Sequence, residues 1–427
     1  MKNLSNELVW RVETRQVKEL VVWKENPRKL KKGDLEKLME RIKQRGFHAV
    51  IVIDTDNTIL SGNQRKIALV KLNVTEVNVL VPNRKLSEEE RRKIAFEDNL
   101  HDGQWDMEKL KTFEMDFLSD IGMSDMDLSK IWEGSLEAEN DEFNVSEEIK
   151  KIKEPKTRKG DLIIFDKHKL LCADATDSNA VKALFGDDRA SMIYSDPNFN
   201  IGLDYDKGVG NKSSYGGKVD DNRSAEDYKE FIRKTLVNAL SVSKKDVHCF
   251  YWCDEAWVWV FQTLFNENGI KNRRLNIWLK NNSSPCPNTA FNKIIEVCCY
   301  GTIGSPYLCN SLKNLNEVMN KELTTGNKLF EDVTNVLAVK RLPSSEYEHP
   351  TTKPPSLHEK PILRCSKVND IIFDSFSGSF STAICAEQLH RRVYSLEISE
   401  IFCDLAIRRW EKMTGKKVKV IHNFYEK

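Results

Sequence analysis

Residues 190–199 read Ala-Ser-Met-Ile-Tyr-Ser-Asp-Pro-Asn-Phe, and residues 371–380 read Ile-Ile-Phe-Asp-Ser-Phe-Ser-Gly-Ser-Phe. In each stretch a short apolar run is followed at once by a carboxylate and by small or polar residues. This pattern predicts the carboxyl end of a buried parallel strand that opens into a loop. In open α/β sheets, ligands bind at such ends, where the strand order reverses.

The two loops differ in what they offer a ligand. Asp196, Pro197 and Phe199 supply a carboxylate, a rigid turn and an aromatic face. The loop around Gly378 is a turn of small residues that leads into a helix. Together they predict a site for an amino-bearing planar ring beside a nucleotide-like cofactor. The alternative is that Asp196-Pro197-Asn198 is only a polar turn that ends a strand.

The second part of the chain alternates between strand-like and helix-like segments, which predicts a doubly wound parallel sheet. We expect strands at 162–165, 169–172, 190–194, 247–252, 275–279, 294–300, 369–373 and 392–396, and helices at 178–186, 224–243, 254–268, 381–389 and 399–414.

The first part of the chain has a shorter α/β pattern. We expect a strand at 17–21, a helix at 33–46, a hairpin of 50–53 with 58–60, a helix at 64–72 and a strand at 77–81, followed by helical structure from Ser87 to about Trp132. Residues 134–159 are charged and poor in aromatic residues, and they predict a linker. The expected division is therefore 1–133, a linker 134–159, and 160–427.

Composition limits the class of protein. A chain of 427 residues is too long for one typical core, so two or three domains are expected. The net charge of +1 argues against a uniformly basic coat but leaves room for a local basic groove. No apolar run is long enough to predict a membrane span. Ten cysteines without regular spacing predict reduced thiols in the cytoplasm and no metal site.

The segments Asp196-Pro197-Asn198-Phe199 and 374–380 resemble the catalytic and cofactor motifs of the DNA amino-methyltransferases, which carry Asp-Pro-Pro-Tyr and Asp-x-Phe-x-Gly-x-Gly. The motif order resembles the β-type permutation of that family. The resemblance implies a Rossmann-like S-adenosylmethionine-dependent fold and site-specific methylation of adenine in double-stranded DNA. It also implies a place in restriction-modification or phage biology, in a bacterial or phage-infected cell. β-type relatives often form homodimers.

The resemblance assigns roles to residues of this chain. Asp196 and the carbonyl of Pro197 would accept hydrogen bonds from the target amine, and Phe199 would stack on the flipped base. The implied catalytic set is Asp196, Pro197, Asn198 and Phe199, and the implied cofactor set is Asp174, Lys353, Asp374, Phe376, Gly378, Ser379 and Glu397.

Within that cofactor set, Glu397 would take the ribose hydroxyls. Lys353, in the stretch 349–354 that matches His-Pro-Thr-x-Lys-Pro, would pair with the methionine carboxylate. Residues 281–341 are the expected target-recognition insert.

Several positions depart from the family pattern. Asn198 replaces a proline and is expected to loosen the catalytic loop, while Phe199 keeps the stacking face without a hydroxyl. Ala173 replaces the glycine that the family has before Asp174, and Ser375 replaces the proline after Asp374. Phe380 stands where the family has the last glycine of the cofactor turn. A benzyl side chain there conflicts with a positive φ or close packing, so either the loop is rearranged or cofactor binding is weakened or lost.

A second resemblance concerns the N-terminal part. Asn26-Pro27-Arg28 and residues 62–68 resemble a ParB/sulfiredoxin-like domain. It implies that Gly62 and Arg65 lie at a nucleotide or DNA-phosphate contact, because a glycine turn before a helix suits an anion. Two rival functions stay open: a methyltransferase-derived DNA-binding protein without activity, and a ParB-like nucleotide-dependent DNA-binding module.

Overall fold

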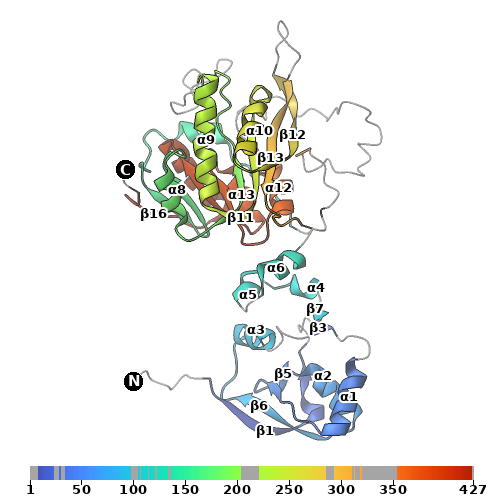
Figure 1. Cartoon of the computed structure of the whole chain (residues 1–427). Coiled ribbons are helices and arrows are strands. Elements are labelled where there is room, and N and C mark those ends of the chain that lie inside the picture. Colours follow the sequence, from blue (N-terminus) through green and yellow to red (C-terminus); the bar gives the residue numbers. More distant parts are fainter. Residues whose placement is uncertain are drawn as a thin grey trace. The chain divides into compact units, whose positions relative to one another are not determined.

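The computed structural model describes residues 8–23, 28–29, 34–97, 104–105, 107–113, 115–120, 123–132, 136–202, 221–284, 293–309, 312, 318–319 and 353–425. The chain divides into unit 1, Met1–Trp132, and unit 2, Glu133–Lys427 (Figure 1).

Unit 1 is built on a five-stranded sheet of order β1-β6-β4-β5-β2. Its strands are β1 (Trp10–Gln16), β2 (Val21–Val22), β4 (Ile51–Ile53), β5 (Thr58–Ser61) and β6 (Glu76–Pro82), with helices α1 (Asp34–Arg45) and α2 (Asn63–Lys71) between them. The β4–β5 hairpin is antiparallel, which confirms the expected hairpin. The core is aliphatic and includes Ile51, Ile53, Ile59, Leu69 and Val79.

The expected strand at 17–21 is wrong. The structure has a 3₁₀ helix, η2 (Val17–Glu19), between β1 and β2. Val17 and Leu20, three residues apart, are both buried, and that spacing suits the three-residue period of a 3₁₀ turn rather than the alternation of a strand. The long strand of this region is β1, which pairs with β6 along its whole length.

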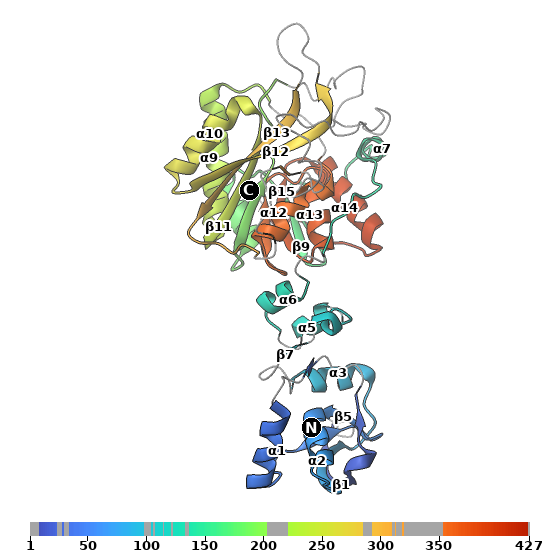
Figure 2. The ribbon, with the colours of Figure 1, turned by 90° about the vertical axis from the view of Figure 1, so that its right-hand side faces the viewer.

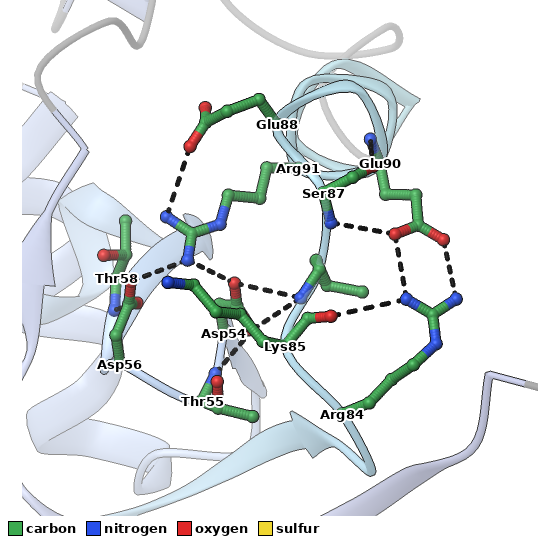
Figure 3. A network of polar contacts seen from close by, with 11 residues as sticks. Asp54, Thr55, Asp56, Thr58, Arg84, Lys85, Ser87, Glu88, Glu90 and Arg91 are labelled. Carbon is green, nitrogen blue, oxygen red and sulfur yellow. Dashed lines mark hydrogen bonds and ion pairs between the residues drawn. The ribbon is translucent and has the colours of Figure 1, made fainter.

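A buried acid ties the β4–β5 turn to helix α3 (Glu88–Glu97), which follows β6. Asp54 is 0% exposed, and its carboxylate lies 2.5 Å from the guanidinium of Arg91, which also contacts Asp56 at 2.6 Å (Figure 3). Ser87 and Glu90 form a reciprocal cap at the start of α3: each backbone N–H donates to the other's side chain. These contacts fix the first turn of α3 against the sheet of unit 1.

The helical stretch expected from Ser87 to Trp132 is interrupted. After α3 come a short strand β7 (Gln104–Trp105), which pairs with β3 (Arg28–Lys29), and three short helices, α4 (Met107–Leu110), α5 (Met115–Asp120) and α6 (Asp125–Ile131). Phe96 of α3 packs edge-on against Phe113, with ring centroids 4.8 Å apart. This aromatic contact joins α3 to the short helices.

Unit 2 contains a nine-stranded sheet of order β12-β13-β11-β10-β14-β15-β9-β8-β16. Its strands are β8 (Leu162–Phe165), β9 (His168–Cys172), β10 (Ala190–Ser195), β11 (Ser243–Cys253), β12 (Lys271–Ser284), β13 (Lys293–Ile303), β14 (Ile371–Asp374), β15 (Arg392–Glu397) and β16 (Lys419–Ile421).

The central strands β11, β10, β14, β15 and β9 are parallel. The outer strands are antiparallel, because β8–β9 and β12–β13 are hairpins and β16 returns along β8. The doubly wound sheet is confirmed, with parallel strands in its centre and antiparallel pairs at both edges.

Helices cover both faces of this sheet. α8 (Ser178–Phe185), α9 (Ala225–Ser241) and α10 (Val258–Glu267) bury their apolar residues on one face, whereas α12 (Glu359–Cys365), α13 (Ser381–Gln388) and α14 (Glu400–Thr414) cover the other (Figure 2). Along β10, Ile193 faces the first layer, and Met192 and Tyr194 face the second. The alternation explains why residues 190–194 are apolar without a break.

The region expected as a linker packs on unit 2. Helix α7 (Val145–Lys150) places Val145 against Leu405 of α14. Asp141 forms a bidentate pair with Arg409, both bonds at 2.6 Å. Some of the charges in 134–159, such as Asp141, therefore form fixed ion pairs on unit 2, which sequence composition cannot distinguish from solvated charge.

The expected recognition insert falls mostly outside the described residues. Within 281–341 the structure describes 281–284 and 293–303, which belong to the β12–β13 hairpin, and a few residues beyond. Among the described residues, none of the helices combines the length and apolarity that crossing a membrane requires.

Candidate functional site

Four predicted site segments meet at one edge of the sheet. Asp174 follows β9, Glu397 ends β15, Asp374 ends β14 and Asp196 follows β10. These four strands are parallel neighbours in the order β9-β15-β14-β10, so their carboxyl ends lie side by side. The next strands along the chain, β11 and β15, lie on opposite sides of the β10–β14 pair, so the strand order reverses there.

The loop after β10 is held in place by its neighbours. The Asp221 carboxylate accepts hydrogen bonds from the backbone N–H groups of Asn200 (2.7 Å) and Ile201 (3.2 Å) and from the side-chain amide of Asn198 (3.3 Å). Trp257 Nε1 donates to the carbonyl of Asn200 at 3.1 Å. The expectation that Asn198 loosens this loop is therefore corrected: its amide supplies one of the bonds that hold it.

Asp196 lies within a cluster of charges. The ammonium of Lys353 is 2.7 Å from Asp196 Oδ2 and 3.2 Å from Glu296 Oε2, and Glu296 pairs in turn with Lys280. Lys353 is 6% exposed, whereas the side chain of Asp196 is 32% exposed and so can meet a ligand. Lys353 was expected to meet the methionine carboxylate; its partners in the structure are two carboxylates of the protein.

Two aromatic rings border the same ammonium. Lys353 Nζ lies 5.0 Å from the centroid of Phe199 and 4.7 Å from that of Trp252. A cation over an aromatic face is stabilised by the ring quadrupole. The face of Phe199 therefore points to the same place as the carboxylate of Asp196.

The cluster sets the protonation states. Burial raises the pKa of Asp196 above its ordinary value, against the pull of Lys353. Burial acts to lower the pKa of Lys353, but Asp196 and Glu296 raise it above its ordinary value. Burial acts to raise the pKa of Glu296, but Lys353 and Lys280 lower it. Near neutral pH the lysine is therefore charged and Glu296 is ionised.

The loop after β14 has polar atoms without partners. The hydroxyl groups of Ser375 and Ser377 are buried, and neither has a hydrogen-bond partner among the described residues. The N–H of Ser375 donates to Ser195 Oγ at 3.4 Å, which joins this loop to the end of β10. Buried polar atoms normally find partners, so two unpartnered hydroxyls in one loop fit a polar ligand.

The remaining predicted cofactor residues lie around this loop. Glu397 accepts from the N–H of Gly378 at 2.8 Å, and Asp174 accepts from the N–H and hydroxyl of Thr176, both at 2.8 Å. Ser379 turns away: its carbonyl and hydroxyl accept from Arg409 of α14 at 2.7 and 3.1 Å. Glu397 and Gly378 are thus brought together, and Ser379 is drawn to α14.

Asp374 and Phe376, also in the predicted cofactor set, make contacts within the protein. Asp374 is buried and accepts from the N–H of Phe376 at 3.0 Å, and burial raises its pKa to about 7. The ring of Phe376 packs against Phe231. We conclude that Asp374 orders the turn from within.

The structure shows how a benzyl side chain at Phe380 is compatible with the glycine-like turn of the cofactor loop. Its φ is +67°, so the backbone does adopt the left-handed conformation that favours glycine. Its ring is 1% exposed and packs against Phe165, with centroids 4.5 Å apart. The turn keeps its glycine-like backbone because the benzyl group is directed into the apolar core.

Sequence reasoning missed four contributors: Glu296, Lys280, Asp221 and Trp257. A signal for Glu296 was present, because it is a lone carboxylate within the apolar strand 294–300 and is only 7% exposed. Of the tryptophans near the site in sequence, Trp252 is buried and Trp259 is 51% exposed. Among the described residues no group of His, Cys, Asp and Glu could hold a metal ion.

For unit 1, Gly62 has a φ of +107° directly before α2, as a glycine turn requires. Arg65, on the first turn of α2, donates to the carbonyl of Val50 at 2.6 Å. Asn26 and Pro27, in the other quoted segment, lie outside the described residues.

A doubly wound sheet with an acid-proline-aromatic loop on one central strand and a small-residue turn on the next defines the class of Rossmann-like methyltransferases. The model of the N6/N4 DNA methylase family matches residues 190–408. The chain belongs to this family of DNA methylases.

Several proteins are similar to parts of this chain. Type II methyltransferase M2.MboI of Moraxella bovis is 27% identical over 248 residues, which cover 54% of this chain and 84% of that protein. M2.DpnII of Streptococcus pneumoniae is 28% identical, with 52% and 82% covered. DNA adenine methyltransferase YhdJ of Escherichia coli is 40% identical over 65 residues, 15% of this chain and 22% of YhdJ.

Two solved structures align with parts of the chain. The complex of M1.HpyAVI with SAM aligns over 56% of this chain and 98% of that one, with 18% identity and a TM-score of 0.37. A Pnob8-like ParB-N domain aligns over 29% of this chain and 48% of that one, with 18% identity and a TM-score of 0.22.

Proposed function

We propose that this protein methylates the exocyclic amine of adenine at specific sites in double-stranded DNA, with S-adenosylmethionine as the methyl donor. The observation that carries the proposal is the placement of Asp196 and Phe199 at the end of β10, directly beside the β14 loop with its unpartnered Ser375 and Ser377. This arrangement places a hydrogen-bond acceptor for an amine beside polar groups that would bond a nucleoside.

The residues present fit the donor. The hydroxyls of Ser375 and Ser377 have no hydrogen-bond partner among the described residues, so they are available to a ligand. Glu397 and Asp174 place carboxylates at the ends of the neighbouring strands. These groups would hold the nucleoside part. When bound, S-adenosylmethionine would supply an electrophilic methyl group on a sulfonium. Phe380 lies in the core, so the reason for the rival hypothesis of a switched-off enzyme falls away.

Asp196 and Phe199 would act on the target base. An exocyclic amine is a poor nucleophile because its lone pair is conjugated with the ring. Hydrogen bonds from the amine to the Asp196 carboxylate and the Pro197 carbonyl draw the nitrogen towards a tetrahedral geometry and stabilise the positive charge that develops on it. Stacking on Phe199 offsets part of the few kcal/mol that flipping the base costs.

Adenine is proposed over cytosine for two reasons. The first residue of the catalytic tetrad is an aspartate, Asp196, which the family uses for adenine more than for cytosine. YhdJ, which is similar over 65 residues, is named as an adenine methyltransferase.

The test is to express the protein in a host that lacks DNA methylases, digest the host DNA to nucleosides and identify modified bases by mass spectrometry. N6-methyladenine that disappears with Asp196→Ala supports the proposal. N4-methylcytosine would overturn the choice of base, and unmodified DNA would overturn the reaction.

We also propose that unit 1 is a ParB-like domain that contacts nucleotide or DNA through the start of α2. The support is the left-handed Gly62 before α2 and the position of Arg65 on its first turn. Retention of DNA by the full chain should then depend on Arg65. Equal retention by Arg65→Ala, with and without nucleoside triphosphate, would contradict this role.

A further inference from the structure

The ammonium of Lys353 has the surroundings that the reaction requires for the target amine. Its nitrogen is 2.7 Å from Asp196 Oδ2 and 5.0 Å from the centroid of Phe199. A flipped base would bring a nitrogen donor to the same carboxylate and a flat ring to the same aromatic face. In the DNA-free protein, Lys353 therefore lies where an amine bonded to Asp196 and stacked on Phe199 would lie.

A second carboxylate adjoins this place. Glu296 lies on β13, is 7% exposed, and has Oε2 at 3.2 Å from Lys353 Nζ. Its other oxygen pairs with Lys280, whose ammonium lies 5.4 Å from the centroid of Trp278. Lys353 thus stands between two carboxylates, one that the reaction uses and one that it does not.

A buried ammonium cannot simply be released from Asp196. Removing one partner of a buried ion pair leaves an uncompensated charge, which is strongly unfavourable. Glu296 offers a nearby alternative, because the ammonium already contacts it. Transfer of Lys353 from one carboxylate to the other keeps the cation paired and frees an oxygen of Asp196.

We propose that Lys353 is a displaceable substitute for the substrate amine and that Glu296 is the positioning residue that receives it when the target base enters. This inference rests on the proposed methyltransferase function and assigns Glu296 a role in it. Lys353 stays close enough to Asp196 after the exchange to favour its ionised form, which is the form that accepts a hydrogen bond from the amine.

The charges around Asp196 give the inference a distinctive pH signature. Lys353, Glu296 and Lys280 face Asp196, and the titratable groups Asp374, Tyr194, Tyr228 and Cys298 are close by. Removing the negative charge of Glu296 lowers the pKa of Asp196, and removing the positive charge of Lys353 raises it. The two variants should therefore shift the acid limb of the rate profile in opposite directions.

The experiment compares the full-length protein with Glu296→Gln, Glu296→Asp, Lys353→Met and the control Glu267→Gln, which removes a surface ion pair with Lys229 on α9 and α10. Transfer of tritiated methyl from S-adenosylmethionine to unmethylated DNA is measured from about pH 4.5 to pH 9, so that the acid limb is covered in every variant. Calorimetry with S-adenosylmethionine and no DNA reports whether each variant is folded and binds the donor.

We expect Glu296→Gln to lower kcat by about tenfold or more with donor affinity unchanged, Glu296→Asp to restore part of it, and the acid limb to move to lower pH. Lys353→Met should lower KM for DNA, because no resident cation competes, and move the acid limb to higher pH. Glu267→Gln should match the unaltered protein.

Two results would overturn the inference alone: a Glu296→Gln variant as active as the control, or acid limbs that move in the same direction in both variants. If Glu296→Gln fails to bind the donor, Glu296→Asp and Lys353→Met still give the KM change and the shift of the limb. No methyl transfer by the unaltered protein would instead overturn the proposed function, and this inference with it.

Discussion

Phe380→Gly is the substitution on which the sequence pattern and the structure disagree most. The family pattern has glycine at this position, so the sequence alone predicts that glycine would restore a cofactor turn. In the structure the turn already has the required backbone, with φ at +67°, and the ring is buried against Phe165. We therefore expect the substitution to damage the core without improving cofactor binding.

Two opposing terms set the magnitude. Loss of a buried phenylalanine ring costs about 3–5 kcal/mol, because the site is left with a cavity. Relief of a left-handed conformation at a non-glycine residue returns about 1–2 kcal/mol. The net loss of stability should be about 1–4 kcal/mol. His390→Gly is the matched control: His390 also has a positive φ, +57°, but its side chain is not in the core, so this variant should gain up to about 1 kcal/mol.

Hydrogen exchange of the α13 amides is the suitable assay, because it reports opening of this part of unit 2 without assuming a single transition for the whole chain. Calorimetry with S-adenosylmethionine should give Kd values for Phe380→Gly and the unaltered protein that agree within about twofold. Equal or greater protection of α13 together with a tenfold tighter Kd would refute the reasoning.

Three further changes test the surroundings of the site. Trp257→Phe removes the hydrogen bond to the Asn200 carbonyl and should lower kcat/KM for DNA about three- to tenfold with donor binding unchanged, as measured by methyl transfer and calorimetry. Asp374 has a folded pKa of about 7 against an ordinary 3.8, so its contribution to stability is full below pH 3.8 and is lost as pH rises through 7. Ionisation of Asp374 should therefore lower the unfolding free energy of the unaltered protein by about 3–5 kcal/mol as pH rises, and Asp374→Asn should abolish this decrease. Urea unfolding at several pH values measures it, and an unchanged pH dependence in the variant would contradict the assignment. Asp404→Ala removes three hydrogen bonds to Lys156 and Thr157 and should cost about 2–4 kcal/mol, visible as a lower Tm.

The local sequence pattern was sufficient to predict the central strands of unit 2. The apolar runs 190–194 and 371–373 are buried on both sides, and such runs identify central parallel strands. Once two such strands are neighbours, the loops after them must adjoin. For this reason the sequence alone predicts that Asp196 and the turn 375–378 lie together.

Contacts between distant segments could not be predicted in this way. The linker interpretation of 134–159 failed because its charges meet partners on α14, such as Arg409 with Asp141, and composition carries no information on such pairs. Glu296 was overlooked for the same reason, since its partner Lys353 lies on a separate segment.

The direction of individual side chains was the second feature that the sequence could not predict. A positive φ at Phe380 was foreseeable from the family pattern, but whether the ring points to the ligand or into the core depends on the packing of Phe165 and its neighbours. Lys353 shows the same limit. Its motif was recognisable, yet only the structure reveals that its ammonium meets Asp196 and not the solvent.

The most direct test of the account is methyl transfer by the purified full-length protein, with tritiated S-adenosylmethionine and DNA free of methylated bases, for the unaltered chain and Asp196→Asn. The account predicts label in N6-methyladenine at specific sequences, and a fall in rate of about 10²–10³ or more for Asp196→Asn with donor binding intact. Label retained at full rate by Asp196→Asn, or DNA left unlabelled by a folded, donor-binding protein, would contradict it.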